Sequence, residues 1–260
     1  MRETVYQRLI ELTNGKASSN VLKTITASKM SKKLIRSYSN VYGINIEEVS
    51  KSTGEFDSLQ QFFVRTLKEA ARPVAEGDAI FASPVDAKIE SCGVIQEDMT
   101  FTVKNQPYTL IDLLGHEKQA TRYRNGQYIV FYLSPADYHR IHSPFNGTVV
   151  RQYVLGQKSY PVNRAGLTYG KKPISHNYRM VSEVAFADHQ HFAFIKVGAM
   201  FVNSIKLTNT STAWKKGEEV GYFSFGSTVV MLFEENSVAF HDHVREGRAI
   251  KMGEAFATVL

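Results

Sequence analysis

Cysteine is almost absent from this chain of 260 residues, which contains Cys92 alone. A single thiol cannot form an internal disulfide, so a disulfide-stapled scaffold is excluded and a reducing compartment is favoured. Long hydrophobic runs are missing as well, because no stretch reaches the roughly 18–20 apolar residues that a membrane-spanning helix needs. The N-terminus also lacks the compact apolar run of a secretory signal. We therefore expect an intracellular protein that does not cross a membrane.

Excess charge is confined to the start of the chain. Residues 1–40 contain eight Lys or Arg against two Asp or Glu, whereas residues 41–260 contain 23 of each sign. The net charge of +6 therefore belongs to the N-terminal end. Nucleic acid is not the expected partner, because no binding motif and no pattern of stacking aromatic residues accompanies these basic residues.

The N-terminal part of the sequence has helical periodicity. Over residues 3–13 the apolar residues recur at a spacing of about 3.6, which predicts a short helix. Residues 27–38 predict an amphipathic helix with one apolar and one basic side. The apolar side comprises Ala27, Met30, Leu34, Ile35 and Tyr38, and the basic side comprises Lys29, Lys32, Lys33 and Arg36. Such a helix can bind an anionic membrane surface or pack on the core with its basic side in solvent, and both interpretations stay open.

A change of pattern divides the chain into two parts. Ser58 and Gln61 have the spacing of a capping box, which predicts a further helix that ends before Pro73. Beyond this point the pattern changes to short β-rich segments separated by Gly, Pro, Asn and Ser. These segments are 128–133, 148–155, 191–205, 220–225 and 228–233. The sequence thus predicts an α+β fold, in which a helical arm over residues 1–56 precedes a β-rich, barrel- or sandwich-like core over residues 57–260.

Three short segments contain the side chains best suited to chemistry. They are Ser83-Pro-Val-Asp86, the segment Tyr132–Pro144 with His139 and His142, and Phe225-Gly-Ser-Thr228. Together they supply a carboxylate, two imidazoles and a hydroxyl, and loops marked by proline often present functional side chains. Each segment alone is equally typical of a turn, a buried histidine or a β-hairpin. Only their combination indicates a site.

The second and third segments resemble signature motifs of one enzyme family. Tyr-Leu-Ser-Pro-Ala-Asp-Tyr-His139-Arg-Ile-His142-Ser-Pro resembles the histidine signature of the phosphatidylserine decarboxylases. Phe225-Gly-Ser-Thr resembles their Leu-Gly-Ser-Thr processing site, and the segments occur in the same order. The chain departs from the family pattern at Ala87, where a glycine is usual, and at Phe225. The resemblance extends from about residue 55 to the end of the chain.

This resemblance implies a precursor that cleaves itself between Gly226 and Ser227. Ser227 then becomes a pyruvoyl group, the covalent cofactor of the family. His142 is the expected base that activates the Ser227 hydroxyl for attack on the Gly226 carbonyl carbon, and Asp86 is expected to orient its imidazole, as in hydrolase triads. The resulting ester is opened by elimination, and hydrolysis leaves the ketone. His139 is expected to return a proton to the substrate after decarboxylation.

The reaction implied by the resemblance is the decarboxylation of phosphatidylserine to phosphatidylethanolamine, through a Schiff base between the substrate amine and the pyruvoyl group. Neither a metal ion nor pyridoxal phosphate is expected. The two chains produced by cleavage, 1–226 and 227–260, are expected to stay associated. The family further implies a homodimer that binds peripherally to the cytoplasmic side of the cell membrane.

Other functions remain open on the sequence alone. A relative that decarboxylates a soluble amino acid would use the same processing residues. A conventional serine hydrolase is disfavoured, because Ser227 lacks the G-x-S-x-G elbow. A zinc enzyme would need Asp86, His139 and His142 as ligands, but the H-E-x-x-H pattern is absent. A β-rich carrier without enzymatic activity would undergo no chain cleavage.

Overall fold

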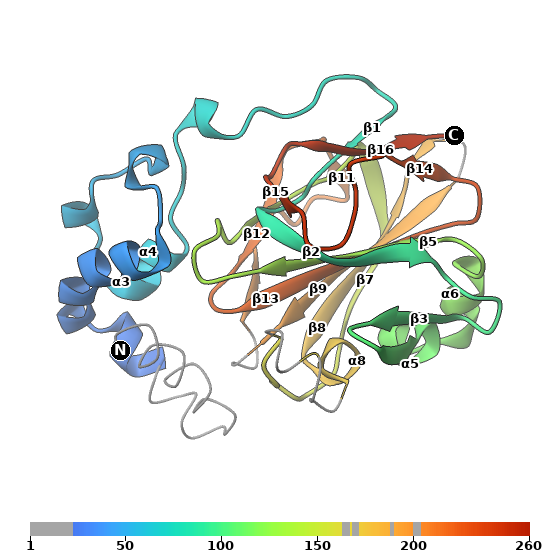
Figure 1. The fold of residues 1–260 in the computed structure, drawn as a ribbon, viewed down its shortest axis with the longest axis horizontal. Coiled ribbons are helices and arrows are strands. Elements are labelled where there is room, and N and C mark those ends of the chain that lie inside the picture. The colour runs from blue at the N-terminus through green and yellow to red at the C-terminus, as the bar shows by residue number, and fades with distance from the viewer. Residues whose placement is uncertain (1–22, 163–166, 168–171, 188–189, 200–203) are drawn as a thin grey trace.

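The computed structural model describes residues 23–162, 167, 172–187, 190–199 and 204–260 (Figure 1). The helix that the sequence predicts near the N-terminus, over residues 3–13, lies outside the described residues. Within them, no helix is long and apolar enough to span a membrane.

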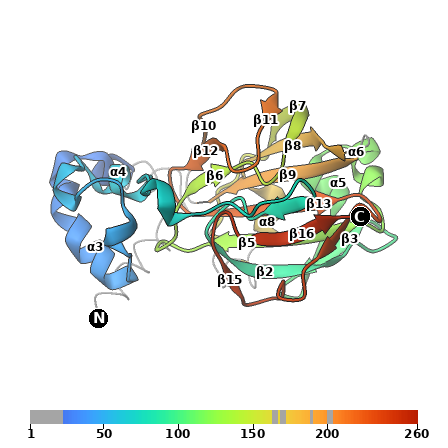
Figure 2. The same cartoon turned by 90° about the horizontal axis from the view of Figure 1, so that it is seen from above.

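A helical arm precedes a β-rich body and lies to one side of it (Figures 1 and 2). Its helices are η2 (Lys29–Leu34), α3 (Ile35–Tyr42), η3 (Ile46–Glu48), η4 (Thr53–Glu55), α4 (Leu59–Phe63) and η5 (Glu69–Ala71). The arm has a small apolar core of its own, made by Ile35, Tyr38, Val49, Phe56, Leu59, Phe62 and Phe63. It can therefore hold its shape beside the body.

The amphipathic segment is not the single α-helix that its periodicity predicts. Residues 29–34 form a 3₁₀ helix, and the α-helix begins only at Ile35. Because a 3₁₀ helix has 3.0 residues per turn instead of 3.6, the apolar side chains do not stay on one side. Ile35 and Tyr38 are buried in the arm, whereas Met30 is 80% exposed and Leu34 is 40% exposed. The segment thus presents large apolar side chains to solvent beside its basic residues.

Helix α4 begins at the predicted capping residue. The Ser58 side chain accepts a hydrogen bond from the backbone N–H of Gln61 at 3.2 Å. The helix ends at Phe63, earlier than the sequence predicts, and Leu67 pairs with Val49 in an isolated β-bridge. The chain after α4 is therefore mostly non-helical where it leaves the arm for the body.

The body consists of strands β1 to β16 with three short helices in the described residues. The strands are β1 (Ile80–Ala82), β2 (Ala87–Val94), β3 (Thr100–Val103), β4 (Gln106–Thr109), β5 (Gln127–Leu133), β6 (Arg140–His142), β7 (Gly147–Leu155), β8 (Arg179–Ala185), β9 (His191–Gly198), β10 (Ile205–Leu207), β11 (Ala213–Trp214), β12 (Glu219–Phe223), β13 (Ser227–Phe233), β14 (Val238–Phe240), β15 (Ala249–Ile250) and β16 (Ala255–Val259). The helices are α5 (Leu110–Leu114), α6 (Glu117–Arg122) and α8 (Pro173–His176). All the β-rich segments that the sequence predicts contain a strand, although residues 191–205 are divided between β9 and β10.

An antiparallel sheet of eight strands, in the order β11-β7-β8-β9-β13-β5-β2-β15, organises the body. Strands β1, β14 and β16 cover one of its faces, and α5, α6 and α8 cover the other (Figure 1). Strand β13 lies between β9 and β5, and all seven of its side chains are buried. Because β13 is buried on both faces of the sheet, residues 228–233 form a continuous apolar run instead of an alternation of apolar and polar residues.

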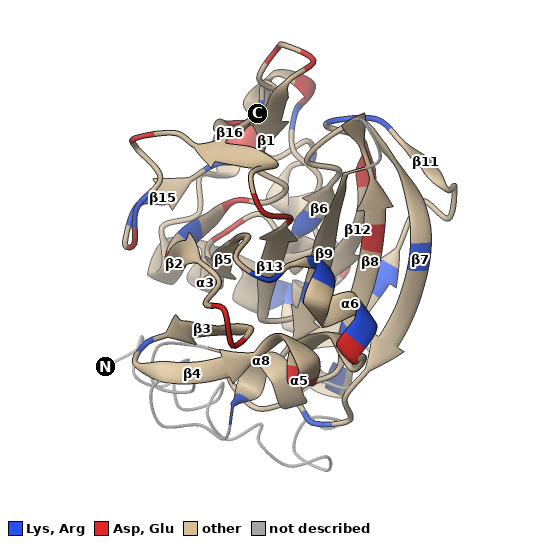
Figure 3. Cartoon of the chain, turned by 90° about the vertical axis from the view of Figure 1, so that its right-hand side faces the viewer, with Lys and Arg blue, Asp and Glu red and all other residues tan. Residues whose placement is uncertain are grey.

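The predicted α+β fold with a β-rich core and an N-terminal helical arm is confirmed. The described sheets have open strand orders, so the core is sandwich-like and not a closed barrel. Basic and acidic residues are interspersed over the side of the body turned away from the arm (Figure 3). This agrees with the even charge count of residues 41–260.

Candidate active site

The peptide bond between Gly226 and Ser227 lies at the start of β13, inside the large sheet. Ser227 pairs with Leu133 of β5 and with Gly198 of β9. Its side chain is fully buried, and its Oγ has no hydrogen-bond partner among the described residues. Leaving a buried hydroxyl unpaired costs free energy, so such a group calls for a functional explanation.

The carbonyl group of the predicted scissile bond is polarised by the backbone. The carbonyl oxygen of Gly226 accepts a hydrogen bond from the N–H of Ala199 at 2.9 Å. A donor in this position stabilises the negative charge that develops on the oxygen when a nucleophile attacks the carbon. Sequence reasoning missed Ala199, because a backbone donor leaves no signature in the residue type.

The Ser204 side chain packs closely on Gly198, beside Ser227. A Cβ on Gly198 would clash with the Oγ of Ser204, which is itself buried and has no hydrogen-bond partner among the described residues. Because residues directly opposite in antiparallel strands share a face, the side of Gly198 that Ser204 occupies is the side to which Ser227 points. The site therefore has two unpaired hydroxyl groups on one face of the sheet.

Asp86 is buried and is bound by an arginine instead of a histidine. The Nε of Arg72 lies 2.8 Å and 3.0 Å from its two carboxylate oxygens, and the Nη2 of Arg72 lies 2.5 Å from Oδ2. The backbone N–H of Met252 donates a further bond to Oδ1 at 2.8 Å. Arg72 also pairs with Glu48 of the arm at 2.9 Å, so this ion-pair network connects the arm to the body.

His142, at the end of β6, is a buried neutral imidazole. Its Nδ1 lies 2.9 Å from the carbonyl oxygen of Gly217, and since a carbonyl can only accept, the proton is on Nδ1. Nε2 therefore carries the lone pair and lies 3.1 Å from the hydroxyl of Tyr138, which donates to it. Burial is the main cause that lowers the pKa of His142. The basic nitrogen is thus available chemically but is covered by Tyr138.

The structure places Asp86, in the loop before β2, near the end of β6 at His142, without joining their side chains. The backbone N–H of His142 donates to the carbonyl of Pro84 at 2.9 Å, in the loop that leads to Asp86. Among the described residues, no hydrogen bond joins the two side chains, and none joins either of them to Ser227. In the intact chain, the Gly217 carbonyl fixes the His142 tautomer, a task that the sequence led us to expect of Asp86.

His139 lies on the side of the cleavage site that faces the arm. Its ring packs on Phe63 of α4 with the centroids 4.0 Å apart, and Phe63 stacks in turn on Phe225 at 5.4 Å. Nδ1 donates to the carbonyl of Asp137 at 2.8 Å, whereas Nε2 is buried and has no partner among the described residues. Burial, and then the positive charge of Arg65, lower the pKa of His139 to about 3. His139 is therefore neutral, with an unused lone pair on Nε2.

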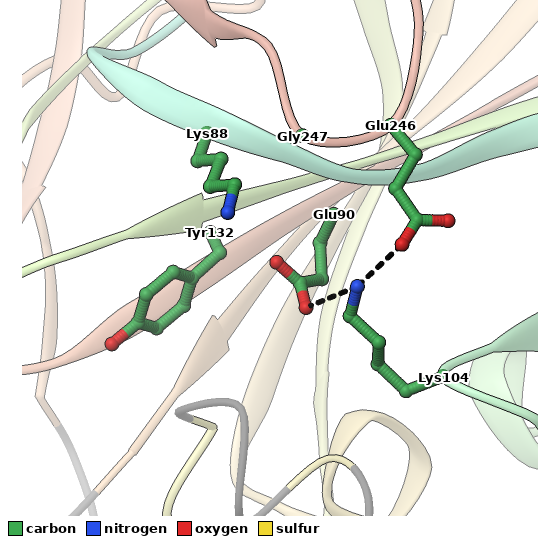
Figure 4. A pocket seen from close by; sticks show the side chains of 6 residues that line it. All are labelled: Lys88, Glu90, Lys104, Tyr132, Glu246 and Gly247. Carbon is green, nitrogen blue, oxygen red and sulfur yellow. Dashed lines mark hydrogen bonds and ion pairs between the residues drawn. The ribbon is translucent and has the colours of Figure 1, made fainter.

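A cavity of about 370 Å³ opens on the sheet face to which Thr228 points. Thr228 pairs with Tyr132 of β5, and Tyr132 pairs with Lys88 of β2, so the three side chains form one row on the same face. The cavity is lined by Lys88, Glu90, Lys104, Tyr132, Glu246 and Gly247 (Figure 4). Thr228 directly follows the predicted cleavage site, but the Ser227 side chain points to the other face of the sheet.

The charges in this cavity are unequally paired. The Nζ of Lys104 lies 3.2 Å from Glu90 and 2.5 Å from Glu246 (Figure 4). Lys88 makes no ion pair within the described part of the chain. Burial is the main cause that raises the pKa of Tyr132 to about 12, so its hydroxyl stays protonated. The cavity thus combines one unpaired ammonium group with a neutral hydroxyl.

Metal ligation has no support in the described ranges. No group of three or more His, Cys, Asp or Glu side chains in these ranges is arranged to hold a metal ion. Asp86 is bound by Arg72, and the Nδ1 atoms of His139 and His142 donate to backbone carbonyls.

Comparison with known proteins assigns this arrangement to one family. The family model described as phosphatidylserine decarboxylase matches residues 59–258. Relatives named phosphatidylserine decarboxylase proenzyme include that of Geobacillus sp. (strain WCH70), which is 48% identical over 254 residues and covers 98% of each chain. Those of Bacillus cereus (strain B4264) and Bacillus thuringiensis (strain Al Hakam) are each 46% identical over 260 residues, which cover 100% of this chain and 99% of the relative.

Proposed function

The chain belongs to the phosphatidylserine decarboxylase family, and we propose that it cleaves itself between Gly226 and Ser227 and then decarboxylates phosphatidylserine to phosphatidylethanolamine. One observation carries the first step. The buried Ser227 hydroxyl has no partner among the described residues, and it adjoins a carbonyl group polarised by the Ala199 N–H. A nucleophile and a stabilised electrophile therefore stand next to each other in the chain.

In this proposal His142 is the base for cleavage. Its Nε2 has the lone pair, and the Tyr138 hydroxyl that covers it must turn away or pass the proton on before Ser227 can be deprotonated. Asp86 is assigned to stabilise the imidazolium that forms, because its negative charge favours the protonated state of His142. Release of Asp86 from Arg72 would strengthen this effect.

The cleavage steps balance without an external oxidant or reductant. Attack of the Ser227 Oγ transfers the Gly226 acyl group from nitrogen to oxygen, which forms an ester. Elimination removes the α-proton of residue 227 and expels the Gly226 carboxylate, so that dehydroalanine remains. Water then replaces nitrogen, and ammonia leaves as the pyruvoyl group forms.

The pyruvoyl group supplies a ketone that condenses with a primary amine and draws electrons from the carbon that loses its carboxylate. His139 is the proposed proton carrier for this chemistry. Its neutral Nε2 can accept the proton that a substrate ammonium must lose. The same nitrogen can then return a proton to the carbon that has lost carbon dioxide, so one imidazole serves both steps.

The cavity beside Tyr132 is the proposed site for the phosphate group of the substrate. Lys88 and Thr228 are two strand spacings apart, roughly 10 Å. The Lys88 side chain can span much of this distance. Ser227 points to the opposite face in the intact chain, so the pyruvoyl group at the new chain end must turn towards the Thr228 face to meet the amine of a substrate held there. Lys88 is an exposed residue that lines the cavity and makes no ion pair in the described residues, and such an ammonium group is suited to a phosphodiester.

The arm is the proposed contact with the membrane. Its exposed apolar side chains, Ile25, Met30 and Leu34, lie among the lysines of η2. Apolar side chains can enter the headgroup layer while the lysines bind anionic lipid. We accordingly propose peripheral binding to the cytoplasmic side of the membrane. The homodimer implied by the family stays a prediction that light scattering can check.

Intact-protein mass spectrometry tests the proposed self-cleavage. Freshly expressed wild type should give two chains that separate at Gly226, the second beginning with a pyruvoyl group at position 227, whereas Ser227→Ala should give one. A single uncleaved chain from folded wild type would contradict the proposal. Assays of the cleaved protein with phosphatidylserine, free serine and aromatic amino acids then decide between the lipid and the soluble alternative.

A further inference from the structure

The helical arm holds the loop that leads to His139. The Tyr38 hydroxyl donates to the carbonyl of Pro135 at 2.9 Å. The Nη2 of Arg65 donates to the carbonyls of Ala136 and Asp137 at 2.7 Å and 3.0 Å. Two side chains from the arm therefore engage three consecutive carbonyl groups of a loop in the body.

Arg65 and His139 converge on one oxygen atom. The carbonyl oxygen of Asp137 accepts from the Nη2 of Arg65 at 3.0 Å and from the Nδ1 of His139 at 2.8 Å. Because this oxygen can only accept, it keeps the imidazole proton on Nδ1 and leaves Nε2 free. The orientation and tautomer of His139 thus depend on the position of a carbonyl that Arg65 holds.

The burial of Arg65 is unusual for a purely structural residue. The residue is only 4% exposed, and its Nε and Nη1 have no hydrogen-bond partner among the described residues. Burial lowers the pKa of Arg65, which reflects the cost of placing its charge there. No carboxylate forms an ion pair with it in the described part of the chain. The guanidinium also lies over the ring of Phe62, 5.3 Å from its centroid, but all its hydrogen bonds within the described residues go to the His139 loop.

Two further contacts join the same part of the arm to the segment around His139. Phe63 packs on the His139 ring, and the Nε of Arg140 donates to the carbonyl of Val64 at 3.0 Å. Three successive residues, from Phe63 to Arg65, therefore contact the segment from Ala136 to Arg140. The arm and this loop form a continuous unit.

We propose that Arg65 and Tyr38 are positioning residues for His139, so that the helical arm completes the active site in addition to any contact with a membrane. The inference rests on the proposed function, because it concerns the decarboxylation step assigned to His139. Self-cleavage is assigned to other groups and does not depend on this contact. The two steps should therefore respond differently when the contact is removed.

The test compares Arg65→Met and Tyr38→Phe with a matched control, Arg179→Met. Arg179 is 3% exposed and donates to the backbone carbonyls of Leu113 and Asp112 at 2.7 Å and 2.6 Å, away from the loop before His139. Each variant is examined by intact mass and by decarboxylation of phosphatidylserine dispersed in detergent micelles. Micelles remove any dependence on membrane binding.

We expect cleavage to proceed in all three variants. The kcat of Arg65→Met should fall at least tenfold and that of Tyr38→Phe severalfold, with KM within about twofold, while Arg179→Met keeps its kcat. The acid limb of the kcat profile should move to higher pH in Arg65→Met, because loss of the positive charge raises the pKa of His139. An unchanged kcat and pH profile in Arg65→Met, or an equal loss in Arg179→Met, would overturn the inference.

Imidazole ¹⁵N NMR of the uncleaved Ser227→Ala protein provides a readout that is independent of activity. His139 should show the Nδ1–H tautomer in this protein and in its Arg179→Met derivative, and a mixture of tautomers in its Arg65→Met derivative. An identical tautomer in all three would count against positioning by Arg65. Failure of wild type to cleave or to decarboxylate would instead refute the proposed function, so the two failures are distinguishable.

Discussion

Lys196 of β9 is a fully buried lysine that takes part in neither self-cleavage nor decarboxylation as proposed. Its Nζ lies 4.4 Å from the centroid of the Phe194 ring and 5.3 Å from that of Trp214, and it donates to the Oγ of Ser182 at 2.8 Å. Burial lowers the pKa of Lys196 to about 7, against 10.5 for an exposed lysine. Between these values the unfolded chain binds more protons than the folded one. The free energy of unfolding therefore rises with pH across this window. Below pH 7 the folded state bears the full cost of the buried lysine.

The substitution Lys196→Met should accordingly stabilise the protein at pH 7. We expect a gain of roughly 1–3 kcal/mol in the free energy of unfolding, because an apolar side chain of similar length avoids the desolvation of an amine. The gain should shrink as the pH approaches 10. Urea unfolding of the uncleaved Ser227→Ala protein, with and without the substitution, measures both effects. A variant that is no more stable at pH 7 would show that Lys196 is well solvated or paired.

Gly198→Ala should slow self-cleavage at least tenfold. Its new Cβ would clash with the Oγ of Ser204 and force that side chain to shift beside Ser227. The double variant Gly198→Ala with Ser204→Ala should recover part of the rate, because the second change removes the atom that clashes. Time courses of chain cleavage by denaturing gel electrophoresis measure both rates. Equal rates in the single variant and the wild type would exclude the packing requirement.

Lys88→Met should raise the KM for phosphatidylserine about fivefold, which corresponds to about 1 kcal/mol for a solvated charge pair. Cleavage and kcat should change little, because Lys88 is two strands away from residue 228. Lys118 of α6 provides the control, because it is an exposed lysine that does not line the cavity. Steady-state kinetics in micelles would refute the phosphate assignment if both lysine variants kept the wild-type KM.

At the scale of elements, the exposed side chains of η2 should decide membrane binding. The double variant Met30→Glu with Leu34→Glu should lose most of its co-sedimentation with anionic vesicles, because both side chains point into solvent and neither packs in the arm core. Ile111→Glu on α5 is a matched control, since Ile111 is also 40% exposed but lies on the body. Equal binding by all three proteins would remove the membrane role of this segment.

Strands were more predictable than helices in this chain. The apolar runs of β5 and β13 are long, and Gly, Asn and Pro residues outside the strands mark the turns, so local pattern and tertiary packing agree. In the arm, tertiary packing overrides periodicity. Ile35 and Tyr38 are drawn into the arm core while Met30 is left outside, and a 100° helical projection cannot express the 3₁₀ geometry that separates them.

The sequence predicted a set of candidate residues but not the contacts that they make. Motif resemblance singled out Asp86, His139, His142 and Ser227. It did not reveal that Arg72 binds Asp86, or that a Gly217 carbonyl fixes the His142 tautomer, because these partners lie far away in the sequence and one of them is backbone. Local patterns carry no information about such pairings, which only the folded chain creates.

For the whole molecule, the two chains should remain together after cleavage. Residues 227–260 contribute three strands that pair with the larger chain: β13 with β5 and β9, β15 with β2, and β16 with β1. Seven residues of β13 pair on each side, and every one is buried. Size-exclusion chromatography in buffer should give one peak that contains both chains, and denaturing electrophoresis should separate them. Loss of the small chain in buffer would mean that the sheet opens on cleavage.

A central strand that begins at the cut also changes how the protein can refold. Before cleavage, β13 finds its neighbours as part of one chain, a first-order process that is independent of protein concentration. After cleavage, two molecules must meet, so recovery from urea becomes second order and slows on dilution. The proposed cleavage would therefore remove the covalent tether on which assembly relies, and slow unfolding would protect the cleaved enzyme in dilute solution, where reassembly is slow.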